Sequence, residues 1–365
     1  MEDSSLAVEF IGNGKNILCI DSISGIIKLQ KNITMKRREF LEKSAIFTAS
    51  MGLAHTFGCT TTVKDPLFKL SLAEWSINSV IFDNYIQDNG YEKFFARIYD
   101  QNDNLAETGA KRNLDFPAMA RKYEIEAVEY VNTCFFHKAE DSEYLSELKN
   151  RCNGEGIKSL LIMVDAQGDL GDPDESKRTS AIENHYKWID AAKFLDCHSI
   201  RVNAASQGTY DEQMQFAADG LSRLGEYGKK AGINVLVENH GGLSSNGQWL
   251  SSVMKMINMK NVGTLPDFGN FMVSSDPEEM YDRYTGVKEL MPFAKAVSAK
   301  ATRFDDAGNE IDTDYVRMMK IVLDAGYRGY VGIESETPGM TAEEGIMATK
   351  KLLEKTRSEL TGNYS

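Results

Sequence analysis

Short apolar segments alternate with amphipathic segments along most of the chain, from about residue 66 to the C-terminus. The apolar segments are bounded by Gly, Pro, Asn or Asp, which is the pattern of buried strands. Eight of them are predicted strands, at 68–75, 125–131, 159–164, 199–203, 235–240, 262–267, 294–301 and 330–334. Helices are predicted at 141–152, 178–195, 211–230, 247–258, 313–325 and 341–358. Two more are predicted to begin at Asp115-Phe116-Pro117 and Asp276-Pro277, where an acidic cap residue precedes or adjoins proline.

Strands that alternate with helices pair in parallel, and eight such units predict a closed (β/α)₈ TIM barrel of the α/β class. An open doubly wound sheet is the alternative, but no Gly-x-Gly-x-x-Gly turn opens a helix in this sequence. A long insertion at 79–112 follows the first strand and is rich in Tyr and Phe. Because these aromatic residues are too many for a solvated loop, we expect a lid or a homo-oligomer contact there, with packing on the barrel's own helices as the alternative.

Composition narrows the range of partners. The chain has 365 residues, 42% of them hydrophobic, and a net charge of −13. A nucleic-acid binder or a protein that binds anionic membranes would need a basic face, so neither partner is expected. No later segment approaches the roughly 18 apolar residues of a membrane span. The expected partner is a small molecule.

Residues 1–59 differ from the rest and are predicted to lie outside the barrel domain, which we place at 60–365. Arg37 and Arg38 are followed by Glu, Phe and Leu and then by a weakly apolar run at 45–54, which resembles a twin-arginine export signal with Met35 as its natural start. Export to the periplasm is therefore expected, and a cytoplasmic protein with a basic N-terminus is the alternative. Cys59 follows Phe and Gly, a degenerate lipoprotein site, so a lipid anchor there is less favoured.

Carboxylates stand at the C-terminal ends of the predicted strands, where the chemistry of such barrels takes place. They are Glu238, Asp267 and Glu334. Three acids at the same height on neighbouring strands would repel one another unless a cation lay between them. Oxygen ligands favour Mn²⁺ or Mg²⁺, and an added imidazole would shift the preference toward Mn²⁺, Co²⁺ or Zn²⁺. The alternative is that each acid forms a separate ion pair at the surface.

Four other residues near these strand ends could take part in binding a metal ion or a substrate. Side chains alternate along a strand, so His240 is expected on the same side as Glu238, and Lys300 on the same side as Ser298. His240 could complete a metal site or bind backbone in the core. Trp75, at the mouth of the first strand, could stack on a sugar ring or fill the core.

Over most of residues 66–358 the chain resembles the xylose-isomerase-like barrel superfamily, in particular sugar (phosphate) isomerase/epimerase proteins related to ketose 3-epimerases. The segment from Gly326 to Glu334 reads Gly-Tyr-Arg-Gly-Tyr-Val-Gly-Ile-Glu, and this closing motif is typical of that family. Its members hold one divalent metal ion with Glu, Asp, His and Glu on strands five to eight, and Glu238, Asp267 and Glu334 match three of these.

The sequence departs from the family at two histidines. Ser298 stands where the strand-seven His is usual, and Asn270 stands where another His follows the Asp by three residues. A hydroxyl is a weaker ligand than an imidazole, so the resemblance leaves Ser298 or His240 as the fourth ligand. It implies one divalent ion, with Mn²⁺ favoured over Mg²⁺, Co²⁺ and Zn²⁺.

The activity that the resemblance implies is sugar isomerisation or epimerisation. One of Glu238 and Glu334 would remove the proton next to a ketose carbonyl, the metal would stabilise the enediolate, and the other Glu would return a proton. His240, Asn270, Lys300 and Trp75 would bind the substrate.

Three alternatives remain from the sequence. A 3-keto-glycoside lyase would use the same proton removal followed by elimination, and export favours a free sugar or glycoside as substrate. A sugar-binding barrel with a degraded metal site is the non-enzyme alternative. An abasic-site endonuclease is disfavoured because it needs a His-rich centre and a basic face, and this acidic chain has five His in all.

Overall fold

The computed structural model describes residues 65–100 and 102–364, so the predictions for residues 1–59 lie outside the described part of the chain. Within these residues, eight parallel strands form one sheet in the order β6-β5-β4-β3-β2-β1-β10-β9. Their bounds are β1 Lys69–Ala73, β2 Ala127–Val131, β3 Lys158–Met163, β4 Ser199–Val202, β5 Asn234–Glu238, β6 Val262–Leu265, β9 Val297–Ala301 and β10 Tyr330–Ser335. The eight predicted strands and their parallel pairing are confirmed.

Backbone contacts between β6 and β9 bring the two edge strands together. Thr264 forms a parallel bridge with Ala294, and Asp267 forms one with Ser298. The amide of Ser298 donates to the carbonyl of Pro266 at 2.9 Å, and the amide of Phe268 donates to the carbonyl of Ser298 at 3.1 Å. These contacts bring the strand ends that carry the predicted carboxylates side by side.

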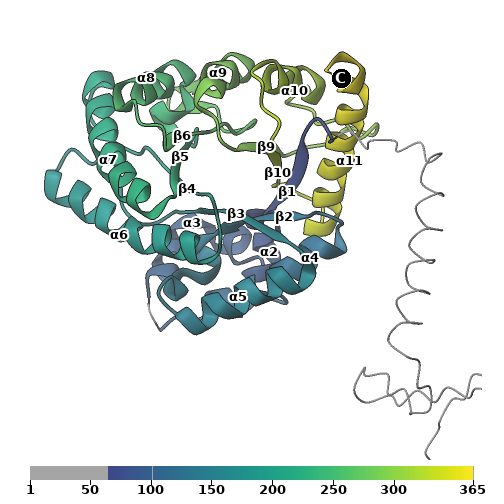
Figure 1. Ribbon diagram of the computed structural model, residues 1–365, viewed down its shortest axis with the longest axis horizontal. Coiled ribbons are helices and arrows are strands. Elements are labelled where there is room, and N and C mark those ends of the chain that lie inside the picture. Colours follow the sequence, from purple (N-terminus) through teal and green to yellow (C-terminus); the bar gives the residue numbers. More distant parts are fainter. Residues whose placement is uncertain (1–64, 101, 365) are drawn as a thin grey trace, which may run out of the picture. The chain divides into compact units, whose positions relative to one another are not determined.

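Helices surround the strands, as Figure 1 shows. They are α4 Phe116–Lys122, α5 Ser142–Glu155, α6 Glu175–Phe194, α7 Tyr210–Ala231, α8 Gly247–Ile257, α9 Arg283–Leu290, α10 Tyr315–Asp324 and α11 Ala342–Leu360. The strands are buried on both faces. Val235, Leu236 and Val237 of β5, for example, are all fully buried, as expected for a parallel sheet covered by helices. No helix in residues 65–100 and 102–364 combines the length and the apolar character needed to cross a bilayer.

The insertion after β1 is helical. It contains a short helix α2 (Asn78–Ile81) and α3 (Tyr85–Tyr99), which breaks its helical geometry at Gly90. Phe94 of α3 is fully buried, and its ring packs edge-on against Phe82 with centroids 4.9 Å apart. Tyr91 on the same helix is half exposed. Some aromatic residues of the insertion are therefore packed in the protein interior, and others are exposed to solvent.

The helix predicted to begin at Asp276-Pro277 is wrong. An antiparallel hairpin lies there instead, formed by β7 (Met272–Ser275) and β8 (Glu278–Met280), with Asp276 and Pro277 in its turn. Asp and Pro favour tight turns as well as helix starts, so the dipeptide does not discriminate between them. The helix α9 begins at Arg283 instead, and the carboxylate of its cap residue Asp282 accepts a hydrogen bond from the amide of Thr285 at 2.8 Å.

His185, in the middle of α6, is a buried histidine with a structural role. Its Nδ1 lies 2.7 Å from the carbonyl oxygen of Ala181, one helical turn earlier. Burial lowers the pKa of His185 from 6.5 to about 4, because the imidazolium would lose its hydration. The unfolded chain takes up this proton at a higher pH than the folded chain. The contribution of His185 to stability is therefore complete above pH 6.5 and is lost as the pH falls toward 4.

We expect acidification from pH 7 to pH 4 to lower the free energy of unfolding of the wild type by about 3 kcal/mol more than that of His185→Gln. The glutamine keeps a polar side chain at this position but does not titrate. Denaturant unfolding of both proteins at the two pH values measures the difference. The same pH dependence in both proteins would contradict the assignment.

Candidate active site

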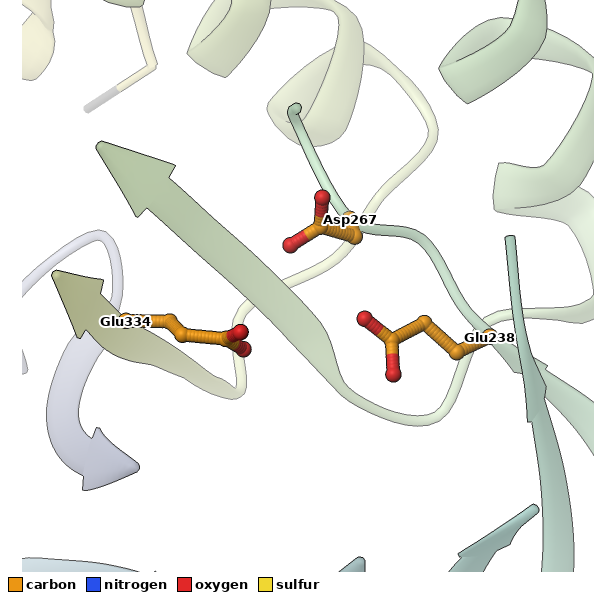
Figure 2. A group of neighbouring side chains, drawn as sticks. All are labelled: Glu238, Asp267 and Glu334. Atoms are coloured by element: carbon orange, nitrogen blue, oxygen red, sulfur yellow. The ribbon is translucent and has the colours of Figure 1, made fainter. Parts of the chain in front are cut away.

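Three carboxylates from three neighbouring parts of the barrel converge at the C-terminal ends of the strands. Glu238 is the last residue of β5, Asp267 lies two residues past β6, and Glu334 lies in β10. One oxygen from each lies within 4.8 Å of the others, and all three side chains are buried. Figure 2 shows the three side chains pointing toward one common space. The structure thus brings together the three acids that the sequence placed at strand ends.

Asn239 sets the relative position of Glu238 and Asp267. β6 ends at Leu265, before Asp267, so the strand ladder does not hold the aspartate. The Asn239 side chain replaces that ladder: its amide donates to the carbonyls of Asp267 and Asn270 at 3.0 and 2.9 Å. Its oxygen accepts from the backbone amide of Asp267 at 2.8 Å. A buried amide with all these partners is a rigid link, so the two carboxylates have fixed positions.

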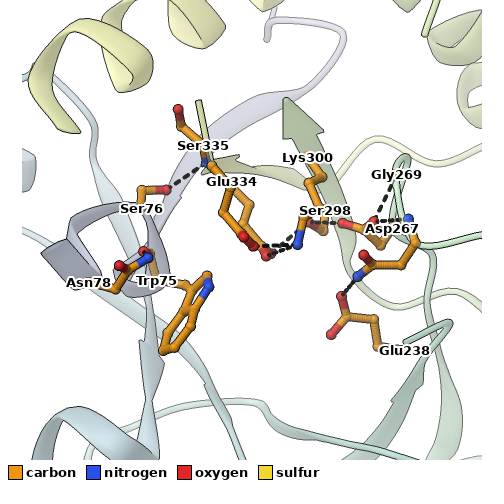
Figure 3. Close-up of polar contacts among 12 residues, drawn as sticks. Trp75, Ser76, Asn78, Glu238, Asp267, Gly269, Ser298, Lys300, Glu334 and Ser335 are labelled. Carbon is orange, nitrogen blue, oxygen red and sulfur yellow. Dashed lines mark hydrogen bonds and ion pairs between the residues drawn. The ribbon is translucent and has the colours of Figure 1, made fainter. Parts of the chain in front are cut away.

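Ser298 lies between two of the acids. Its hydroxyl is 2.7 Å from Oδ2 of Asp267 and 3.0 Å from Oε2 of Glu334. The other oxygen of Asp267 accepts hydrogen bonds from the backbone amides of Gly269 and Asn270. Ser298 is therefore a short bridge at the position that the sequence assigned to a possible fourth ligand (Figure 3).

Two buried cations flank the acids. Nε of Arg201, in β4, lies 2.7 Å from Oε2 of Glu238, and its Nη1 lies 2.7 Å from Oδ1 of Asp165. Nζ of Lys300 contacts Glu334 at 3.2 Å and also pairs with Glu336. The Arg201–Glu238 pair is close but lacks the angle of a hydrogen bond, so Oε2 of Glu238 has no hydrogen-bond partner within the described residues.

Burial and mutual repulsion perturb the acids. Burial raises the pKa of Glu238 to about 7, although Arg201 opposes this and Glu334 adds to it. Burial and the charge of Glu334 likewise raise the pKa of Asp267 to about 7. Burial also acts to raise the pKa of Glu334, but Lys300 and Arg201 together hold it below its ordinary value. The site therefore contains more negative charge than its own cations compensate.

The donor set fits a divalent metal ion. Within the described residues, two cations, Arg201 and Lys300, pair with or lie beside five acids, which leaves a surplus of negative charge. The acids are Glu238, Asp267, Glu334, Asp165 and Glu336. Carboxylate oxygens suit hard cations such as Mg²⁺ and Mn²⁺. Oε2 of Glu238 accepts no hydrogen bond and is held only by its ion pair with Arg201. Within residues 65–100 and 102–364, the cluster of close ligand atoms contains no imidazole.

A cavity of about 420 Å³ is lined by Glu334 of the acid cluster, and we call it the catalytic cavity. Its floor carries Glu334, Lys300 and Arg201, and one wall is formed by aromatic side chains from η1 (Glu74–Ile77) and α3. The four residues predicted to bind substrate, Trp75, His240, Asn270 and Lys300, all line it. So do Tyr91, Phe94 and Phe95 of the insertion.

His240 does not lie in the strand in which it was predicted. β5 ends at Glu238, and the chain then turns so that the backbone amide of His240 donates to Oγ of Ser244 at 3.0 Å. The alternation argument that placed His240 beside Glu238 therefore does not apply. His240 reaches the catalytic cavity from the loop instead.

Sequence reasoning missed Arg201 and Asp165 at the site, and it also missed Glu129, a buried acid outside the cluster of close ligand atoms. Arg201 and Glu129 each interrupt an apolar strand that is buried on both faces. A charged side chain there needs a partner, and this signal could have found both residues. Glu129 accepts a hydrogen bond from Ser71 at 2.6 Å, and burial raises its pKa to about 7.

Comparison with known proteins gives the family. The model of the xylose isomerase-like TIM barrel matches residues 117–356. The chain belongs to the xylose isomerase-like TIM barrel family. The match spans β2 to β10 and includes all three acids of the metal-ligand cluster. A comparison with curated protein sequences gives no significant match.

Three solved structures of low sequence identity share this fold. A D-tagatose 3-epimerase-like protein is 16% identical, with a TM-score of 0.57, over 82% of this chain and 100% of that chain. A xylose isomerase-like barrel from Mycobacterium smegmatis in complex with magnesium is 13% identical, with a TM-score of 0.57, over 82% and 98%. The 3-keto-D-glucoside 4-epimerase from E. coli is 14% identical, with a TM-score of 0.54, over 67% and 95%.

Proposed function

We propose that this xylose isomerase-like barrel is a sugar isomerase or epimerase that uses one divalent ion to remove the proton next to a ketose carbonyl. The observation that carries the proposal is the convergence of Glu238, Asp267 and Glu334, of which Glu334 lines a cavity with aromatic and polar walls. The epimerases among the solved structures of the same fold support the class of reaction. All the donors are oxygen atoms, which suits both Mn²⁺ and Mg²⁺, and we propose Mn²⁺ as the ion with Mg²⁺ as the next choice.

Glu238, Asp267 and Glu334 would hold the ion, which, when bound, acts as a Lewis acid toward the carbonyl and lowers the pKa of the neighbouring C–H group. Glu238 and Glu334 extend from β5 and β10 and approach from opposite sides in Figure 2. One can take the proton from one face of the sugar carbon, and the other can return a proton to the opposite face. Arg201 and Lys300 compensate the charge of each glutamate while the proton moves.

The proposal is tested by incubation of the metal-loaded protein with a panel of ketoses in D₂O. We expect deuterium at the carbon next to the carbonyl and formation of an epimer or aldose, both measured by NMR. No exchange with any ketose in the presence of Mn²⁺ or Mg²⁺ would contradict the proposal. Sugar binding without exchange would favour the non-enzyme alternative.

Elimination from a keto-glycoside is the second candidate. The catalytic cavity shares two lining residues with a neighbouring cavity, which leaves space for a leaving group next to the reacting carbon. The same proton removal would then expel the group instead of returning the proton. Release of an alcohol from a keto-glycoside, with no epimer, distinguishes this outcome.

Ser298→His tests how the set of metal ligands is completed. An imidazole is a stronger ligand for Mn²⁺ than a hydroxyl, so we expect the substitution to tighten Mn²⁺ binding about tenfold or more. Isothermal titration calorimetry measures the affinity, and Ser298→Ala is the control for loss of the hydroxyl bridge. If His240 completes the set instead, Ser298→His should weaken binding, and His240→Ala should release the ion.

A further inference from the structure

A second cavity adjoins the catalytic one. It has a volume of about 760 Å³ and lies between the insertion and the loop that follows β10. Tyr91 and Glu336 line both cavities, so the two share a wall. We call it the adjoining cavity. Each volume is in the range of roughly 300–1,000 Å³ that is typical of small-molecule sites.

The adjoining cavity is lined by hydroxyl and amide side chains. They come from η1, α2 and α3 on one side and from the loop after β10 on the other, and include Ser79, Asn84, Gln87, Thr337 and Thr341. These groups both donate and accept hydrogen bonds, which suits a ligand that carries many hydroxyls. The lining, as far as the chain is described, includes no Lys, Arg or His. Its acids, Asp83 and Glu336, would repel a phosphate.

The two cations that line the catalytic cavity are already paired. Lys300 lies between Glu334 and Glu336 and lines only the catalytic cavity. Arg201 lies between Glu238 and Asp165. Neither side chain is free to bind an anion in the adjoining cavity. The charges therefore favour a neutral ligand.

Tyr91 offers an aromatic surface where the two cavities meet. Its side chain is 49% exposed, and its ring is stacked on Trp75 with centroids 6.4 Å apart and an angle of 18° between the planes. An exposed, supported ring of this kind can pack against the C–H face of a sugar. A ring that lines both cavities can contact two linked sugar units at once.

Buried hydrogen bonds join the two sides of the adjoining cavity. Oγ of Ser76 donates to the carbonyl of Ile333 at 3.1 Å. It accepts from the amide of Ser335 at 2.9 Å (Figure 3). These bonds join η1 to the end of β10, directly beside Glu334. The side chain of Gln87 donates to Asn78 at 3.1 Å, which orders the insertion side. The adjoining cavity is thus preformed.

We propose that the substrate has two linked sugar units, and that the adjoining cavity binds the second, uncharged unit while the first lies over the acids. This inference rests on the proposed function for the first unit. It assigns the protein to unphosphorylated disaccharides or sugar glycosides in preference to free or phosphorylated monosaccharides.

Matched pairs of ligands test the substrate class. The probes are D-fructose, fructose 6-phosphate, and the glucosyl-fructoses maltulose and isomaltulose, which differ in linkage. Calorimetry with the Mn²⁺-loaded protein should give at least one disaccharide a Kd at least tenfold lower than that of D-fructose. Tighter binding of fructose 6-phosphate than of every disaccharide would overturn the inference, and so would equal binding of D-fructose and both disaccharides.

Variants of its lining residues test whether the second sugar unit binds in the adjoining cavity. Ser79→Trp should fill part of this cavity, and Gln87→Leu should remove a polar group from its wall. Each should reduce the ratio of disaccharide to fructose affinity at least fivefold. Asn153→Leu is the matched control, because Asn153 lies in α5 and lines a cavity at the N-terminal end of β3. An unchanged ratio in both Ser79→Trp and Gln87→Leu would contradict this placement.

The outcomes separate this inference from the proposed function. Tight binding of a disaccharide without proton exchange would support the adjoining cavity and contradict the isomerase. Exchange on monosaccharides with no preference for a disaccharide would do the reverse. Binding of none of the probes would count against both.

Discussion

Glu238→Gln, Asp267→Asn and Glu334→Gln are each expected to reduce the rate of proton exchange on the substrate by about 10³-fold or more. Each substitution keeps the size of the side chain but removes one charged donor from a buried group of three. In the case of Glu238 and Glu334 it also removes a proposed base. The exchange of substrate hydrogen with D₂O, followed by NMR at saturating metal, measures the loss.

Glu129→Gln is the matched control for these variants. Glu129 is a buried carboxylate of the barrel like the other three, but it does not belong to the cluster of close ligand atoms. Retained activity in Glu129→Gln would show that the loss of a buried acid does not by itself stop the reaction. Full activity in all three cluster variants would place the reaction elsewhere in the molecule.

Arg201→Met is expected to destabilise the fold by about 3–5 kcal/mol in the absence of metal. Arg201 is buried between Asp165 and Glu238, with a nitrogen 2.7 Å from each carboxylate. Its removal leaves two largely buried acids without their cation, and methionine cannot compensate their charge. Denaturant unfolding measures the change in the free energy of unfolding.

Arg303→Met provides the comparison for this substitution. Arg303 also pairs with a carboxylate, that of Asp312, but its side chain is 61% exposed. Solvent screens such a pair, so we expect a loss of less than about 1 kcal/mol. Similar losses in both variants would show that the buried pair has no special role.

Most of the barrel could be predicted because its strands are local patterns. A buried parallel strand needs a continuous apolar run, and Val235 to Val237 is such a run. The hairpin at Asp276-Pro277 could not be predicted in the same way. Its two strands are short and exposed, so they lack an apolar pattern, and the cap signal of Asp-Pro fits a turn equally well.

The candidate site could be predicted only in part. Glu238 and Glu334 stand out because each ends an apolar run, and Asp267 closes the run on the neighbouring strand. The partners of these acids depend on tertiary distances that no local pattern contains. Arg201 meets Asp165 across two strands, and Asn239 links the chain after β5 to the chain after β6. The adjoining cavity likewise forms between segments about 250 residues apart.

The most direct test of the account is a metal titration of the metal-free protein. The wild type should bind one Mn²⁺ or Mg²⁺ per chain, measured by calorimetry and by elemental analysis after dialysis. Glu238→Gln, Asp267→Asn and Glu334→Gln should each lose most of this binding, whereas Glu129→Gln should retain it. The absence of a bound divalent ion in the wild type, or equal binding in all four variants, would contradict the claim that these three carboxylates form a metal site.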